Sequence, residues 1–296
     1  MRIGGVQARE ALKGYAFISP WLIGFVAFTF LPIGLAVYYS LCDYSLLQPP
    51  VYNGLDNYRA MGGDKVFWLA LRNTLYYAGM ALPLGMLCAL FMALLLHTNI
   101  KGRALYRAIV FLPSIVPASA AAMLWLWILN PKLGLINLVL THLGVQNPPG
   151  WVADKQWAMP ALAFISIWGI GKTVVVYLAG LGDVPRELYE AAEIDGASAW
   201  RKIWHVTLPT ISPVIFFNLI VAIIGTMNFF VLPFIMTQGG PNRATYFFTY
   251  YLYDNAFTYL KMGYASAMAV VQLVIVLALT GIAFWTSRRW VHYSGR

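Results

Sequence analysis

The chain has 296 residues, of which 60% are hydrophobic and only 10% are charged, whereas an ordinary soluble domain carries about 25% charged residues. This composition excludes a water-soluble globular protein and predicts an integral membrane protein. The formal net charge is +9, but the basic residues are spread over the loops rather than gathered on one face, which excludes nucleic-acid binding.

Six apolar stretches follow one another along the chain. A helix needs about 20 residues to cross about 30 Å of hydrocarbon, and four uncharged stretches exceed that length. A fifth is interrupted only by Lys172, and a sixth begins at Pro209. The six predicted spans are residues 14–42, 73–100, 108–131, 157–181, 209–236 and 262–287. We therefore predict an all-α polytopic membrane protein, with a further short helix over 134–144 at the outer interface.

Prolines interrupt most of these spans. A proline inside a helix leaves one carbonyl without its hydrogen bond and kinks the helix axis. We expect kinked helices that enclose a cavity rather than a solid core, with kinks at Pro20, Pro32, Pro83, Pro113, Pro117, Pro160 and Pro233.

The distribution of Lys and Arg predicts the orientation, because short loops rich in basic residues remain in the cytoplasm. With the N-terminus inside, the cytoplasmic segments hold twelve of the 20 basic residues and the outer segments hold seven. Both termini are therefore predicted to be cytoplasmic. The charged segment from Asp183 to His205 is then cytoplasmic as well.

This charged segment has the pattern of two short helices between two spans. Asp183 and Pro185 predict a helix start with a short polar cap, and Gly196 predicts its end. A second helix follows, with an apolar face formed by Trp200, Ile203 and Trp204. The first helix offers small residues and exposed carboxylates that suit a groove on another protein, namely Ala191, Ala192, Glu187, Glu190, Glu193 and Asp195. The simpler alternative is a solvated loop that only links two spans.

The same segment resembles the signature of the inner-membrane permeases of binding-protein-dependent ABC importers. That signature is Glu-Ala-Ala, three residues, Gly, nine residues, Ile, one residue and Leu-Pro. Here it reads Glu190-Ala191-Ala192, Gly196, Val206 and Leu208-Pro209, with Val206 as the single departure. Four further motifs are similar to the carbohydrate-uptake branch, in particular to the first permease subunit of maltose and glycerol-3-phosphate importers: residues 19–22, 54–58, 238–241 and 262–267.

The resemblance implies a type I importer permease fold, with one transmembrane permease domain over residues 1–296, in a bacterial or archaeal cytoplasmic membrane. It implies import of a sugar, an oligosaccharide or a related polyol or glycerophosphate. The implied partners are a second homologous permease, two cytoplasmic ATPase subunits and an extracytoplasmic solute-binding protein. The segment 183–209 would couple to the ATPase through Glu187, Glu190, Ala191, Ala192, Asp195, Gly196, Leu208 and Pro209. ATP hydrolysis is then expected on a partner, so the chain is expected to be neither an enzyme nor a cofactor-binding protein.

Lys172 is the first candidate for the substrate path, because an ionisable residue at membrane depth is costly. It lies nine residues before Leu181, or about 13 Å from the cytoplasmic end of its span. In one interpretation Lys172 faces the translocation cavity and favours an anionic or strongly polar cargo. In the other it snorkels to the interface or pairs with carbonyls freed by prolines. Further candidates, which packing alone would also explain, are Trp168, Tyr177, Asn228 and Phe229.

Two other classes of protein fit the sequence less well. An ion-coupled secondary transporter of a polar solute is the main alternative, but no carboxylate falls within a predicted span to bind the coupling ion. A membrane-embedded enzyme lacks a catalytic cluster, since the two cysteines and four histidines form no metal-ligand pattern. The run Gly171-Lys172-Thr173 mimics a phosphate-binding loop, yet residue 166 is Ser where that loop needs Gly.

Overall fold

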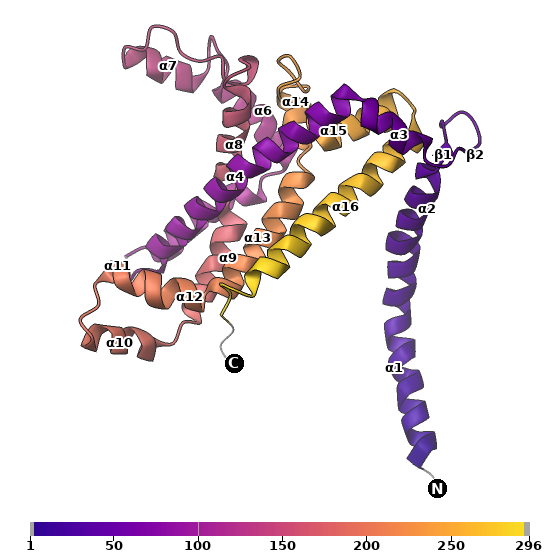
Figure 1. The fold of residues 1–296 in the computed structure, drawn as a ribbon. Helices are drawn as coiled ribbons and strands as arrows, with labels where there is room; N and C mark the ends of the chain where they lie inside the picture. Colours follow the sequence, from indigo (N-terminus) through magenta and orange to yellow (C-terminus); the bar gives the residue numbers. More distant parts are fainter. Residues whose placement is uncertain (1–2, 100, 293–296) are drawn as a thin grey trace. The chain divides into compact units, whose positions relative to one another are not determined.

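The computed structural model describes residues 3–99 and 101–292, and nearly all of them are helical or lie in short connections between helices (Figure 1). Among these residues, four helical segments are long and apolar enough to cross a membrane, and two bent helix pairs raise the number to six if each pair is one span. The predicted all-α fold with about six spans is confirmed. The chain forms two compact units, residues 1–64 with 252–273 and residues 65–251 with 274–296.

The first unit begins with a long hydrophobic helix that continues through a π-helical turn. Asn57 holds the chain where this helical segment ends, because its Nδ2 donates to the carbonyl oxygens of Ser40 at 3.0 Å and Cys42 at 2.8 Å. The Gly263 N–H donates to the carbonyl of Tyr44 at 3.0 Å and so attaches the start of the last helix. The elements are α1 (Ile3–Phe25), the turn Val26–Phe30, α2 (Leu31–Ser40), β1 (Cys42–Asp43), β2 (Val51–Tyr52), α3 (Asp56–Gly63), the π-helical turn Asp254–Thr258 and the first half of α16 (Met262–Ser287). The two strands pair antiparallel.

The second unit is organised around α4 (Lys65–His97), which packs against α8 (Ala158–Trp168), α9 (Gly171–Gly182) and α13 (Ser212–Met227) (Figure 1). Small residues let these helices approach closely, as membrane helices require. Ala89 and Ala93 of α4 are fully buried, and a Cβ at Gly180 would lie 2.7 Å from Val214 Cγ2. The other helices are α5 (Arg103–Phe111), α6 (Ala118–Ile128), α7 (Leu135–His142), α10 (Arg186–Ile194), α11 (Ala199–Lys202), α12 (Leu208–Thr210), α14 (Val231–Met236) and α15 (Phe248–Tyr253).

The third predicted span is not one helix. The segment 103–115 and α6 meet at an angle of 99°. Pro113 is the second residue of a 3₁₀ turn over Leu112–Ile115, and Pro117 occupies the N-cap of α6. Because a proline disfavours the helical conformation of the residue before it, Val116 is extended, with φ −64° and ψ 129°. The two prolines therefore produce a break sharper than the kink predicted from the sequence.

The next two spans are also interrupted. The axes of α8 and α9 differ by 49°, and the break between them lies two residues before Lys172. The last part of the span 209–236 divides at Asn228, between α13 and α14. These breaks place loop backbone and helix ends at membrane depth, where they are tolerated only against protein or a cavity.

Candidate functional site

The predicted helix between residues 185 and 196 is present as α10, but its start differs from the prediction. Pro185 is the N-cap residue, with φ −59° and ψ 134°, and no side chain caps the helix. Asp183 instead follows the last turn of α9. The predicted cap by Asp183 is wrong, because proline already holds an extended N-cap conformation and separates the carboxylate from the first free amides.

The end of α10 requires Gly196. This residue has φ +71°, in the left-handed region that side chains rarely adopt. The Ala197 N–H donates to the Ala192 carbonyl at 2.8 Å, and the Gly196 N–H donates to the Glu193 carbonyl at 3.0 Å. These two bonds are the Schellman arrangement that satisfies the last carbonyls of a helix. The chain consequently turns back toward the membrane spans immediately after Gly196.

Two polar contacts join α10 to the segment that follows it. Lys202 Nζ lies 2.7 Å from Glu193 Oε1, and the hydroxyls of Tyr189 and Thr207 lie 2.9 Å apart. Thr207 is only 3% exposed and belongs to a π-helical turn, Ile203–Thr207, that leads into α12. The same region is anchored by Tyr189, Val206 and Leu208, which pack against a buried cluster containing Val184 and Ile211. These contacts attach α10 to the segment that leads into α12 and α13.

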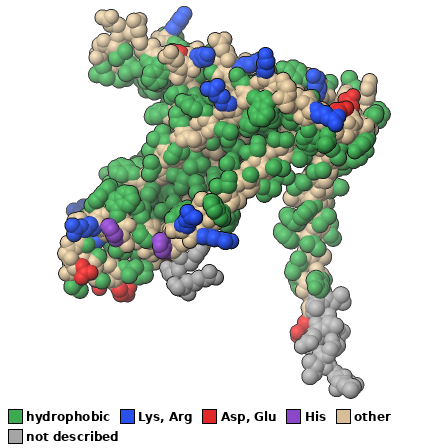
Figure 2. Space-filling view, in the orientation of Figure 1, with side chains coloured by type: hydrophobic (Ala, Val, Ile, Leu, Met, Phe, Trp, Pro, Cys, Tyr) green, Lys and Arg blue, Asp and Glu red, His purple; other side chains and the backbone are tan. Residues whose placement is uncertain are grey.

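The outer face of α10 combines charge with exposed apolar side chains. Glu187, Glu190 and Asp195 are exposed, and Ile194 is 87% exposed. Figure 2 shows acidic, basic and histidine side chains together at the end of the molecule where Figure 1 labels α10 and α11. A cavity of about 460 Å³ separates α10 from the next segment, lined by Leu188, Ala191, Ala192, Asp195, Ala197, Arg201, Lys202, His205 and Val206. Of the predicted coupling residues, Ala191, Ala192 and Asp195 line this groove. Leu208 and Pro209 belong to α12, the helix that follows.

A second cavity lies among the membrane helices. Its volume is about 260 Å³, and it includes Phe229 of the predicted path residues. The ring of Phe229 stacks on Tyr77, with centroids 4.3 Å apart, and the Tyr77 hydroxyl lies 2.6 Å from Ser166 Oγ. The lining residues are Tyr77, Ala81, Leu82, Gly85, Met86, Ser166, Gly169, Ile170, Thr173, Ala222, Gly225, Thr226 and Phe229. Aromatic faces beside hydroxyl groups suit a polyhydroxylated ligand.

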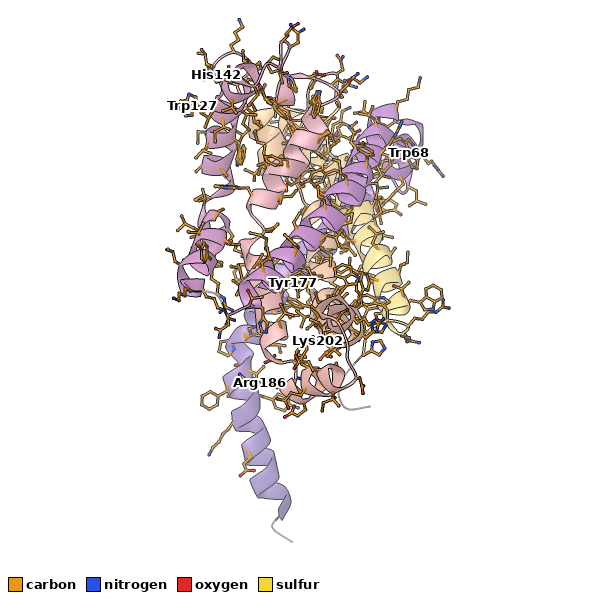
Figure 3. The ribbon with its side chains drawn as sticks, turned by 90° about the vertical axis from the view of Figure 1, so that its left-hand side faces the viewer. Trp68, Trp127, His142, Tyr177, Arg186 and Lys202 are labelled. Carbon is orange, nitrogen blue, oxygen red and sulfur yellow. The ribbon has the colours of Figure 1, made fainter. Side chains whose placement is uncertain are left out.

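The other predicted path residues do not line this cavity. Lys172 and Asn228 are exposed, and Asn228 Nδ2 donates to the Ile224 carbonyl at 2.9 Å, at the end of α13. Tyr177 is 1% exposed, within the buried cluster of α9 and α4, and in Figure 3 its label stands above those of Lys202 and Arg186. Trp168 packs edge to face on Trp125, with centroids 5.9 Å apart.

Sequence reasoning missed Tyr77 and Ser166 in the cavity, and Tyr189 and Thr207 beside α10. Each bears a hydroxyl group, and that polarity is the only signal in the sequence. The partners of a hydroxyl are far apart along the chain, as with Tyr77 and Ser166, so spacing alone does not reveal them.

The sequence is similar to those of known transport proteins. A family described as binding-protein-dependent transport system inner membrane component matches residues 81–292. The probable ABC transporter permease protein YesP of Bacillus subtilis is 40% identical over 97% of this chain and 94% of its own length. The diacetylchitobiose uptake system permease protein NgcF of Streptomyces coelicolor is 34% identical over 92% of this chain and 81% of its own length.

Among solved structures, a bacterial ABC transporter involved in the import of the acidic polysaccharide alginate contains a similar chain. The TM-score is 0.83 and the sequence identity 26%, and the match covers 98% of this chain and 99% of the other. The likeness extends over both compact units, so it includes the broken spans as well as the charged segment between α9 and α13.

Proposed function

The chain belongs to the family of inner membrane components of binding-protein-dependent transport systems, and we propose that it moves a sugar, an oligosaccharide or a related polyol or glycerophosphate across the cytoplasmic membrane. It is a transport permease subunit rather than an enzyme. Its relative NgcF serves diacetylchitobiose uptake, and the similar solved chain belongs to an alginate importer. Both cargoes are saccharides, which supports a carbohydrate as the cargo here.

The assembly that we propose contains a second homologous permease, two cytoplasmic ATPase subunits and an extracytoplasmic solute-binding protein. ATP is hydrolysed on the ATPase subunits. Both termini of this chain lie in the cytoplasm, and so does the segment 183–209. The excess of Lys and Arg on that side of the predicted spans supports this orientation.

The observation that carries the coupling role is the attachment of α10 to the next span. We propose that α10 sits in a cleft of an ATPase subunit, with Glu187, Glu190 and Asp195 at the contact and Ala191 and Ala192 permitting close approach. Closure of the ATPase dimer moves that cleft. The contacts Glu193–Lys202 and Tyr189–Thr207 then pass the movement to α12 and α13, which shifts an equilibrium between inward-open and outward-open forms.

The cavity that contains Phe229 is the proposed contact point for the cargo. A sugar ring would pack against Phe229 where that ring lines the cavity, and it would hydrogen-bond to hydroxyls such as that of Thr226. Trp168, Tyr177 and Asn228 are proposed to act one layer away, by holding the helices that border the cavity. Lys172, on the exposed side of α9, is proposed to favour anionic cargo along a path completed by the second permease.

The test is ATP hydrolysis by the assembled importer in vesicles, across a panel of neutral and anionic saccharides presented by the solute-binding protein. We expect stimulation by one class of saccharide, and uptake only when all subunits and ATP are present. Uptake by the isolated chain in vesicles, driven by an ion gradient without ATP, would show the alternative, an ion-coupled secondary transporter.

A further inference from the structure

Three basic residues meet where α4 ends and α5 begins. His97 is the last residue of α4, and Gly102, with φ +79°, turns the chain into α5. Arg103 and Arg107 follow one turn apart on α5, and both are within electrostatic reach of His97. Arg107 Nη2 donates to the Leu96 carbonyl at 3.3 Å, which holds the start of α5 against the end of α4.

This basic cluster, His97 with Arg103 and Arg107, is not neutralised within the part of the chain that the structure describes. The atoms His97 Nδ1, Arg103 Nε and Arg107 Nε are buried without a hydrogen-bond partner, and neither arginine pairs with a carboxylate of the described residues. Like charges four residues apart on a helix repel. Arg103 also begins a helix that has no side-chain cap, where the helix dipole is already positive. An added anion would relieve both the repulsion between the cations and their unfavourable interaction with the dipole.

An apolar cavity adjoins the basic cluster. Its volume is about 290 Å³, and Arg107 is the one charged residue among those that line it: Leu96, Arg107, Val110, Phe111, Gly171, Val174, Val175, Leu178 and Ala179. The helices α5 and α9 approach closely at the cavity, where a Cβ at Gly171 would lie 2.6 Å from the Val110 carbonyl oxygen. Leu105 and Ile109 of α5 are exposed beside it. The site therefore offers cations at one end and an apolar wall at the other.

We propose that the basic cluster binds the phosphate of an anionic phospholipid, and that an acyl chain of this lipid lies along Val175 and Leu178. A free phosphate would use the cations but not the apolar wall. A soluble protein partner would have no reason to meet the sides of membrane helices. Basic pockets between membrane helices on the cytoplasmic side bind anionic headgroups in this way. The orientation proposed above decides only the leaflet, which is the cytoplasmic one.

The experiment compares lipids retained by the purified full-length chain in an uncharged detergent, by native mass spectrometry. The probes are phosphatidylglycerol and phosphatidylcholine with the same acyl chains, so only the headgroup charge differs. The test variants are Arg103→Gln alone and together with His97→Gln; Arg107 is kept because it bonds to α4. The matched control is Arg288→Gln, since Arg288 is an exposed cation just after α16, at the same predicted membrane face and away from the cavity.

We expect the chain to prefer phosphatidylglycerol, and Arg103→Gln to reduce that preference about five-fold, since one Lys or Arg near an anionic surface contributes about 1 kcal/mol. The added His97→Gln should reduce it by a smaller factor, because a histidine is largely neutral at pH 7. Arg288→Gln should leave this preference unchanged.

Val175→Trp keeps every cation but fills the space along the apolar wall, so it should also release the lipid. It provides the test if the first variants do not fold. Equal retention of both lipids, an unchanged preference in Arg103→Gln, or displacement of the lipid by inorganic phosphate at equal concentration would overturn the proposal. Lipid retention is measured without transport. The lipid-binding proposal can therefore fail without affecting the proposed function, and the proposed function can fail without affecting it.

Discussion

The hydroxyl of Tyr189 on α10 lies 2.9 Å from Thr207 Oγ1, at the end of the π-helical turn that leads into α12. Thr207 Oγ1 also donates to the Lys202 carbonyl at 3.3 Å, so the Tyr189 hydroxyl is the donor in the bond between the two side chains. Because Thr207 is buried, this bond fixes an exposed helix to the interior of the second unit. It is a direct non-covalent link from the proposed ATPase contact to the membrane spans.

Tyr189→Phe should weaken this link while keeping the ring that packs against the cluster around Ile211. The lost hydrogen bond is expected to cost about 1 kcal/mol of stability, which is too little to prevent insertion. In vesicles containing the assembled importer, we expect fewer cargo molecules imported per ATP hydrolysed. Tyr76→Phe is the control, because Tyr76 is an exposed tyrosine of α4. An unchanged ratio of uptake to hydrolysis in Tyr189→Phe would rule out this contact as the transmitting one.

Gly196 has a left-handed conformation, in which any side chain costs about 1 kcal/mol of stability or more, and β-branched residues cost most. Gly196→Val should therefore distort the end of α10 and uncouple hydrolysis from uptake, and so should Gly196→Asp. Gly196→Asn should retain more coupling, since Asn tolerates this conformation.

The matched control for Gly196 is Gly182→Ala. A Cβ at Gly182 meets nothing within 4 Å, and no positive φ is involved. All variants should reach the membrane in equal amounts, as measured by immunoblot of membrane fractions. If Gly196→Val couples as well as Gly182→Ala, the ending of α10 has no part in energy transfer.

Glu190 is exposed and belongs to the proposed contact rather than to the internal packing of the chain. Glu190→Lys should therefore leave thermal stability of the purified chain unchanged and reduce co-purification of the ATPase subunit. Glu190→Gln separates the effect of charge reversal from the loss of the carboxylate, and we expect it to retain partial binding. Equal recovery of the ATPase with Lys and with Glu at this position would contradict the docking role of α10.

The six spans were predictable because hydrophobic length is a direct requirement of the bilayer. The end of α10 was predictable because Gly196 leaves few alternatives to a left-handed helix end. The 99° break before α6 was predictable only as a kink. Two prolines four residues apart each remove one backbone hydrogen-bond donor, but the direction of the chain after them depends on the helices against which it packs.

The orientation of Lys172 was not predictable, for a related reason. Around α9 nearly every residue is apolar, so the sequence has no polar stripe that identifies the outward face. The structure buries Gly171, Val174, Tyr177 and Leu181 and leaves Lys172 exposed. Which molecule meets that exposed face depends on subunits that the sequence of one chain does not describe.

Lys172→Ala tests the proposed preference for anionic cargo. A cation in a low-dielectric path attracts an anionic saccharide and has little effect on a neutral one. We therefore expect uptake of a charged saccharide to fall about ten-fold or more, with uptake of a neutral one unchanged, and Lys172→Arg to preserve both. Unchanged uptake of both saccharides in Lys172→Ala would assign this lysine to the lipid interface.

Tyr77 and Ser166 allow the cargo-binding role of the cavity to be separated from its packing. Ser166 Oγ donates to the Leu162 carbonyl at 3.0 Å, so it accepts the bond from Tyr77. Ser166→Ala should leave the buried Tyr77 hydroxyl without a partner and cost about 1–3 kcal/mol. Tyr77→Phe combined with Ser166→Ala removes both polar groups and should restore most of the stability.

In the double variant the helices remain packed, so a change in uptake reports on cargo binding and not on stability. If the two hydroxyls and the stacked Phe229 ring contact the cargo, uptake should stay low in the double variant even though thermal stability returns. If they serve packing alone, uptake should recover together with stability, because Phe in place of Tyr77 keeps the ring that lies 4.3 Å from Phe229. Melting temperature and the concentration of cargo-loaded binding protein that half-saturates ATP hydrolysis, measured on the same preparations, distinguish the two cases. A rise in that concentration without a fall in melting temperature is the result expected of a cargo site.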